Sequence, residues 1–271
     1  MFMKNRIIRW VKIIVLIYLI VGLALYLLQD RLLFHPVLVA KGKTYGFPYP
    51  HRELMIPYDD ETRLNIIRFL TPDSSKTKGV VLYFHGNAKN IAWYANYSVH
   101  FTRNEYEVWM IDYPGFGKST GLFTEARLYE YALQLYRLAR TRWKPRDIII
   151  YGKSMGTGMA TQLASVRDCR YLILETPYSS LASLVSHFLP IYPVKSFLHY
   201  KFPNDEYLKK VNAPVIILHG TKDRLIPISN ARKLSTLLKI GDEFISVEGA
   251  GHNDLAHFLM FQRTLDSLLS R

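Results

Sequence analysis

The sequence has only one cysteine, Cys169, and this scarcity excludes an intramolecular disulfide. It also lacks the spacings of zinc ligands, since its nine histidines do not recur at i, i+4. We therefore expect neither a metal nor another cofactor. Internal repeats and low-complexity segments are missing too. The remaining composition, 49% hydrophobic and 21% charged over 271 residues, is typical of one globular domain with a short appendage.

The charge balance is basic, but it lacks the pattern of a nucleic-acid-binding protein. The formal net charge is +13, and no long basic tract or aromatic nucleic-acid motif accompanies it. We therefore expect no nucleic-acid partner. The densest basic cluster beyond the N-terminus lies at the end of a predicted helix, residues 137–146. It is either a solvated helix face or a surface for anionic lipid headgroups.

Residues 13–28, IIVLIYLIVGLALYLL, contain no charge and follow four basic residues, Lys4, Arg6, Arg9 and Lys12. Sixteen helical residues span about 24 Å, and snorkelling of the adjacent basic side chains extends the span toward a hydrocarbon core of about 30 Å. The run predicts a membrane anchor, residues 1–30. Its positive flank places the N-terminus in the cytoplasm and the rest of the chain on the periplasmic or lumenal side. A signal peptide cleaved near Ala24 is the alternative, although the apolar run continues past that point.

Beyond a connector, residues 31–51, short apolar runs alternate with longer helical segments, which defines a domain over residues 52–271. Strands are expected at residues 53–58, 63–70, 79–85, 106–113, 147–152, 170–175, 213–220 and 243–249. Helices are expected near residues 90–103, 124–141, 229–239 and 254–270, and directly after Ser154. Continuous apolar strands separated by helices are typical of a mostly parallel sheet buried on both faces. The sequence thus predicts a three-layer α/β domain whose first two strands form an antiparallel edge.

The stretch YGKSMGTG, residues 151–158, contains a G-x-S-x-G motif between an expected strand and an expected helix. This context is typical of a nucleophile elbow, in which glycines on both sides of the serine permit a tight turn. A serine hydroxyl is a weak nucleophile unless a base removes its proton. The motif therefore predicts that Ser154 is a nucleophile and that a histidine and a carboxylate follow it in the chain.

His252, in the loop after the last expected strand, is the candidate base. The other histidines lie in the connector, in helices, in the segment before residue 212, or before a glycine at a strand end. Asp223, in the loop after the preceding strand, is the candidate acid that orients the imidazole. Glu175 is the competing carboxylate because it also ends a strand. Asp112 and Asp254 are expected to be structural.

An oxyanion hole is the remaining requirement of acyl transfer. The glycine turn in HGNAKN, residues 85–90, places a backbone N–H at the end of a strand. We assign this donor to Asn87 and the second to Met155, the residue after the nucleophile. A tight turn without chemistry is the alternative for the segment around Asn87.

The motifs HGNAKN, DYPGFGKSTG, YGKSMGTG, ETPYSS, HGTKDRLIP and GAGHND, together with the order Ser154, Asp223, His252, resemble the α/β-hydrolase superfamily over about residues 52–270. They are most similar to its small, N-terminally anchored serine hydrolases. This branch includes eukaryotic protein depalmitoylases and bacterial proteins grouped with serine aminopeptidases or lysophospholipases. The resemblance implies the α/β-hydrolase fold and hydrolysis of esters or thioesters. The chain lacks the HGGG motif of many lipases and the extended cap of proline-specific peptidases.

Residues 176–212 form a predicted lid, in which Leu181, Leu184, Val185 and Phe188 share one helical face. This face is either an acyl-chain groove above Ser154 or ordinary packing on the core. We therefore expect a membrane-anchored serine hydrolase whose substrate is an acyl ester or thioester, either a lipid or an acylated protein. The alternatives are an acyltransferase that uses the same serine, a serine peptidase, and a non-catalytic binding module.

The anchor hypothesis predicts that a reporter fused after residue 271 lies on the non-cytoplasmic side and that the protein resists alkaline extraction. The reason is that an uncharged helix of this length partitions into the bilayer with its basic flank in the cytoplasm. Protease protection of the reporter and carbonate extraction measure the two properties. Recovery of a mature chain that starts at Leu25 would instead establish a cleaved signal peptide.

Overall fold

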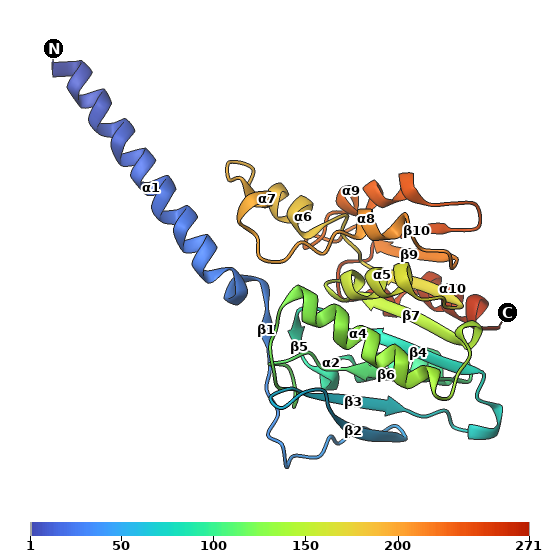
Figure 1. Cartoon of the computed structure of the whole chain (residues 1–271). Helices are drawn as coiled ribbons and strands as arrows, with labels where there is room; N and C mark the ends of the chain where they lie inside the picture. The colour runs from blue at the N-terminus through green and yellow to red at the C-terminus, as the bar shows by residue number, and fades with distance from the viewer. Residues whose placement is uncertain (1, 271) are drawn as a thin grey trace.

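The protein, described over residues 2–270 by a computed structural model, contains an eight-stranded sheet between two layers of helices, with a long helix projecting from the domain (Figure 1). The strands are β1 (His35–Pro36), β2 (His51–Pro57), β3 (Arg63–Phe69), β4 (Gly79–Phe84), β5 (Ala88–Lys89), β6 (Tyr106–Ile111), β7 (Ile148–Lys153), β8 (Tyr171–Glu175), β9 (Val215–Gly220) and β10 (Glu243–Val247). The α-helices are α1 (Phe2–Leu33), α2 (Ile91–Tyr94), α3 (Ser98–Thr102), α4 (Glu125–Arg140), α5 (Gly156–Val166), α6 (Leu181–Phe188), α7 (Val194–Phe197), α8 (Asn204–Leu208), α9 (Ile228–Ala231) and α10 (Leu259–Ser270). Short 3-10 helices are η1 (Ser74–Lys76), η2 (Ala95–Tyr97), η3 (Pro145–Asp147), η4 (Arg232–Leu237) and η5 (Leu255–His257).

The main sheet has the order β10-β9-β8-β7-β4-β6-β3-β2. Neighbours from β10 to β6 are parallel, whereas β6, β3 and β2 pair antiparallel. The predicted mostly parallel sheet and its antiparallel edge are thus confirmed. The central strands β4, β7 and β9 are buried along their whole length, which explains why their sequences are continuously apolar rather than alternating.

Two hydrophobic cores lie on opposite faces of the sheet. One contains side chains of α4, α5 and the lid, together with Phe34, the residue directly after α1. The other contains side chains of α3 and α10. Successive residues of a strand point to opposite cores. In β7, Ile148 and Ile150 lie in the first core and Ile149 lies in the second. Each face therefore needs its own layer of helices.

Several expected elements differ in detail. α1 continues to Leu33, beyond the expected limit of 30, and the connector forms β1, which pairs with β5 in a separate small sheet. The expected helix 90–103 is divided into α2, η2 and α3, and the region 229–239 into α9 and the 3-10 helix η4. The last helix begins at Leu259 after η5 rather than at residue 254. The Asn90 side chain accepts from the Ala92 amide and so fixes the start of α2, while pairing with β5 makes part of the connector a strand.

Ile149 lies at the centre of the sheet and is fully buried. We expect Ile149→Ala to lower the free energy of unfolding by about 2–5 kcal/mol, because it removes buried methyl groups and leaves a cavity. Ile240→Ala is the matched control, since that side chain is fully exposed and the change should stay within about 0.5 kcal/mol. Thermal unfolding of the full chain in detergent would measure both. If both variants lowered the free energy of unfolding equally, Ile149 would not be part of the core.

Candidate active site

The candidate site lies at the point where the strand order reverses. β4 pairs on one side with β6, the next strand of the main sheet along the chain, and on the other side with β7. The helices that follow β4 and β7 therefore diverge and leave a crevice at the carboxyl ends of these strands, where α/β sheets bind ligands. Phe84 ends β4 and Lys153 ends β7, so residues 85–87 and Ser154 meet there.

Ser154 occupies a strained turn between β7 and α5. Its φ angle is +52°, a conformation uncommon for a residue with a side chain, and its amide donates to the Glu175 carbonyl over 2.9 Å. The turn requires Gly156, because a Cβ there would lie 2.0 Å from the Phe84 carbonyl oxygen. It also requires Gly152, because a Cβ added at that position would lie 2.6 Å from the Gly156 carbonyl oxygen. The two glycines let the turn pack closely on β4 and present the serine at the crevice.

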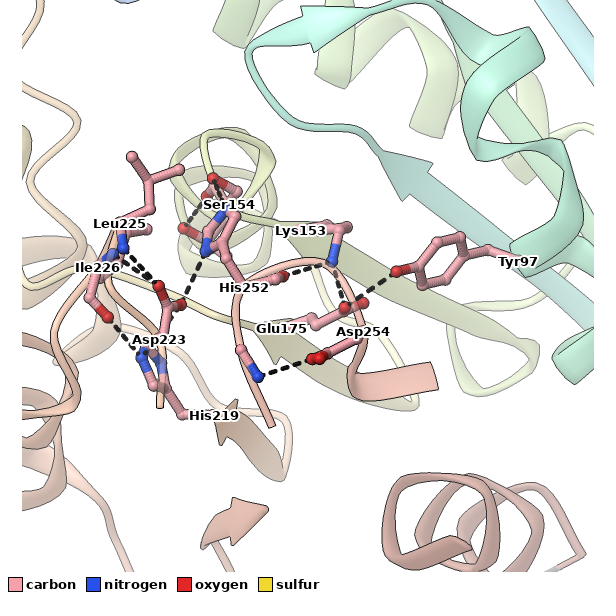
Figure 2. A network of polar contacts seen from close by, with 12 residues as sticks. Tyr97, Lys153, Ser154, Glu175, His219, Asp223, Leu225, Ile226, His252 and Asp254 are labelled. Carbon is pink, nitrogen blue, oxygen red and sulfur yellow. Dashed lines mark hydrogen bonds and ion pairs between the residues drawn. The ribbon is translucent and has the colours of Figure 1, made fainter. Parts of the chain in front are cut away.

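Ser154, His252 and Asp223 form a hydrogen-bonded chain (Figure 2). His252 Nε2 is 3.0 Å from Ser154 Oγ, and His252 Nδ1 is 2.7 Å from Asp223 Oδ2. A carboxylate only accepts, so Nδ1 carries the proton and Nε2 is left to accept from the serine hydroxyl. The other oxygen of Asp223 accepts from the amides of Leu225 and Ile226 at 2.9 and 2.8 Å. The carboxylate is therefore fixed from two sides.

The surroundings keep Asp223 ionised. Burial alone would raise the pKa of this carboxyl, but the hydrogen bonds that it accepts from His252 and the Ile226 amide lower it below its usual range. His219 lies 3.6 Å from the same carboxylate. Burial lowers the pKa of His219, so it is neutral, and its Nε2–H donates to the Ile226 carbonyl over 2.9 Å. His219, one of the histidines that precede a glycine at a strand end, thus stabilises the loop that carries Asp223, a role that the sequence did not predict.

Glu175, the competing carboxylate, belongs to a different cluster. It is fully buried, forms an ion pair with Lys153, and accepts from the hydroxyl groups of Tyr151 and Tyr97 (Figure 2). Lys153 also donates to the His252 backbone carbonyl over 3.2 Å. The pair therefore connects the end of β7 to the loop that carries His252, and its carboxylate is occupied away from the imidazole ring.

The two other acidic residues take up structural hydrogen bonds. Asp254 accepts from the Gly251 amide over 2.7 Å, which stabilises the turn around His252. Asp112 accepts from the Ile91 amide over 2.9 Å and lies 3.4 Å from the buried ring of His85. Both carboxylates therefore support loops and take no part in the serine chain.

Asn87 and Met155, the expected oxyanion donors, line the same cavity as Ser154. Within residues 2–270, neither backbone amide donates a hydrogen bond, so both remain able to bind an oxygen. The carbonyl of Asn87 accepts from the His35 amide over 2.8 Å, and its side chain donates to the Leu33 carbonyl over 2.5 Å. The start of the connector therefore holds the segment that carries one of these amides.

The cavity has a volume of about 190 Å³ and is mostly apolar. The lid residues expected to share one face line it: Leu181, Leu184, Val185 and Phe188. Its other walls come from three segments: the end of α1 with the residue after it, the rest of the lid, and the loop after Asp223. Their lining residues are Leu32, Leu33, Phe34, Tyr178, Phe202, Leu225 and Ile226. The sequence did not predict that α1 lines this cavity. The residue that could have indicated a contact between α1 and the domain is Gln29, an uncharged polar residue directly after the apolar run.

The chain is similar in sequence to several known proteins. The family described as "Serine aminopeptidase, S33" matches residues 75–204. Alpha/beta hydrolase domain-containing protein 17B of Homo sapiens is 31% identical over 203 residues, which cover 73% of this chain and 68% of that protein. Protein 17C of Xenopus tropicalis is 32% identical over 202 residues, which cover 73% of this chain and 63% of that protein. The match therefore spans less than two thirds of the 17C relative.

Solved structures share the fold at lower identity. An esterase of Pyrococcus furiosus superposes with a TM-score of 0.66 and 16% identity, covering 88% of this chain and 98% of that one. The thioesterase domain from the curacin biosynthetic pathway gives a TM-score of 0.59 and 15% identity, covering 82% and 100%. The chain therefore belongs to the α/β-hydrolase family that contains the alpha/beta hydrolase domain-containing proteins 17B and 17C.

Proposed function

We propose that the protein hydrolyses carboxylic esters or thioesters of acyl groups through Ser154, His252 and Asp223. The observation that carries this proposal is the hydrogen-bonded chain of these three side chains, which ends at a serine facing an apolar cavity. His252 Nε2 takes the hydroxyl proton while Ser154 Oγ attacks the acyl carbonyl. The amides of Asn87 and Met155 hold the resulting oxyanion. Asp223 orients the imidazole and stabilises its positive charge.

The reaction then proceeds through an acyl-enzyme. The protonated His252 gives its proton to the leaving alcohol or thiol, and the carbonyl re-forms as an ester on Ser154. Neutral His252 next removes a proton from water, whose oxygen attacks the acyl carbon. Return of that proton to Ser154 Oγ releases the acid and restores the site.

The apolar lining of the cavity supports a hydrocarbon acyl chain rather than a polar substrate. Residues 3–33 of α1 are long and apolar enough to cross a membrane. We infer an anchor over residues 1–30, a connector over 31–51 and a hydrolase domain over 52–271, held on the non-cytoplasmic side by the basic N-terminal flank. Acylated proteins and membrane lipids are the two substrate classes that such a location would offer, and the resemblance to depalmitoylases favours a thioester or ester of a long acyl chain.

We expect Ser154→Ala or His252→Ala to lower turnover of p-nitrophenyl butyrate by about 10⁴-fold or more, with little further loss in the double variant, because the triad acts as a unit. Steady-state kinetics of the full chain in detergent would measure this. A fluorophosphonate should label the wild type and not Ser154→Ala. If the folded wild type is neither labelled nor active on any acyl ester, the chain is a binding module and the proposal is wrong.

Asp223→Asn should lower turnover by about 10⁴-fold, because an amide favours the wrong imidazole tautomer. Glu175→Gln is the matched change at the competing carboxylate. It should lower the free energy of unfolding by about 3–5 kcal/mol, because Lys153 is left buried beside a neutral group, while activity measured below the melting temperature persists. Kinetics and thermal unfolding separate the two effects. Loss of hydrolysis in Glu175→Gln with near-normal hydrolysis in Asp223→Asn would reverse the assignment.

A further inference from the structure

The C-terminal half of α1 contacts the lid along one face. Gly22, Leu25, Gln29 and Leu33 are less exposed than their neighbours, and their spacing places them on one side of the helix. Gln29 is 4% exposed. Its Nε2 donates to the Phe197 carbonyl over 3.2 Å and its Oε1 accepts from the His199 amide over 2.8 Å. A buried amide satisfied at both ends fixes the helix against the lid.

A second contact joins α1, nearer its N-terminus, to the lid tip. We define the lid tip as residues Phe188–Val194. Tyr18 and Tyr192 stack with ring centroids 4.6 Å apart. The Tyr18 hydroxyl donates to the Ile191 carbonyl over 3.0 Å, and the Tyr192 hydroxyl donates to the Tyr18 carbonyl over 3.2 Å. Figure 1 shows the segment between α6 and α7 extending from the domain toward α1. The lid therefore follows the helix away from the domain.

This contact sets the depth of the lid tip in a bilayer. Tyr18 lies ten residues before Leu28, the end of the uncharged run, which corresponds to about 15 Å of helix. The hydrocarbon core is about 30 Å thick, so Tyr18 lies near its middle. The basic residues at the opposite end of the run prevent α1 from sliding outward. The lid tip is thus held within the leaflet on the side of the hydrolase domain.

The composition of the lid tip suits hydrocarbon. It contains no charged residue, and Phe188 and Ile191 are 53% and 70% exposed. Irregular backbone in a membrane is costly because its polar groups lack water. Here Pro190 and Pro193 have no N–H to satisfy, and the Tyr192 and Val194 amides donate to carbonyls within the tip at 3.2 and 2.8 Å. The tip therefore leaves few backbone donors without a partner.

A second cavity, of about 210 Å³, lies between α1 and the lid. It shares Leu32, Leu33, Val185 and Phe188 with the Ser154 cavity, so the two cavities adjoin. Leu25 of α1 and Leu189 of the lid tip line only this second cavity. An apolar path consequently leads from Ser154, between α1 and the lid, to side chains at membrane depth.

We propose that the acyl chain of a membrane-resident substrate lies in this path and enters it from the hydrocarbon along α1. The proposal rests on the proposed function at Ser154 and adds a role for the anchor. α1 forms one wall of the acyl site, and the immersed lid tip forms the other. The scissile carbonyl then reaches Ser154 while the chain remains in apolar surroundings throughout.

The first test is chain-length selectivity of the full chain in phosphatidylcholine nanodiscs. We expect Leu25→Trp and Leu189→Trp to lower the ratio of kcat/KM for p-nitrophenyl palmitate to that for p-nitrophenyl butyrate by about tenfold or more, because each indole fills space that only a long chain needs. Leu27→Trp is the matched control, because this 67% exposed side chain points away from the lid, and its ratio should equal that of the wild type.

Ratios equal to the wild-type ratio in both Leu25→Trp and Leu189→Trp would overturn the proposal while leaving the assignment of Ser154 intact. An equal drop in Leu27→Trp would overturn it as well, because any bulky change on α1 would then suffice. Hydrolysis of neither ester by the wild type would instead contradict the proposed function itself.

The second test measures depth and needs no activity. In a Cys169→Ala background, Ile191→Cys and Ile240→Cys would each carry an environment-sensitive fluorophore in nanodiscs. Ile240 is fully exposed on the domain and serves as the control. We expect doxyl-labelled lipids to quench the label at residue 191 several-fold more than the label at 240. Equal quenching would show that the lid tip lies outside the bilayer and would overturn the proposal.

Discussion

The close approach of the β7–α5 turn to the end of β4 is the constraint on which the site depends. Gly156 lies so near the Phe84 carbonyl that no side chain fits between them. This contact holds Ser154 in its left-handed conformation at the sheet's switch point. It also places the Met155 amide beside residues that follow β4. The positions of Ser154 and of the Asn87 and Met155 amides thus depend on one contact between two strand ends.

The remaining parts of the site are carried by loops, and buried polar interactions hold those loops in place. His219 and the amides after Asp223 fix the carboxylate, while Lys153 and Glu175 connect the end of β7 to the backbone of His252. Such interactions are costly to break, because a buried group without its partner loses its water and gains nothing. The loops can therefore hold Asp223 and His252 in a fixed position beside Ser154.

The long apolar helix α1 is connected to the same site. Leu33 and Asn87 are joined by a hydrogen bond, so the end of α1 touches the segment after β4 that lies beside Ser154. Gln29 and Tyr18 join α1 to the lid, and the lid covers Ser154. Helix α1, the lid and the turn that carries Ser154 are consequently linked through direct contacts.

The order of apolar strands determined the three-layer fold and its antiparallel edge, because burial on both faces requires continuous hydrophobic strands. The sequence also predicted that Ser154, Asp223 and His252 lie near one another, because each follows a strand and the carboxyl ends of parallel strands meet at one edge of the sheet. What only the tertiary structure decided are the relations between distant segments: the pairing of Glu175 with Lys153, the bracing by His219, and the wall formed by α1. Local sequence patterns report which side of an element is apolar, but they do not report what covers it. That choice is made by packing between residues far apart in the chain, as between Tyr18 and Tyr192.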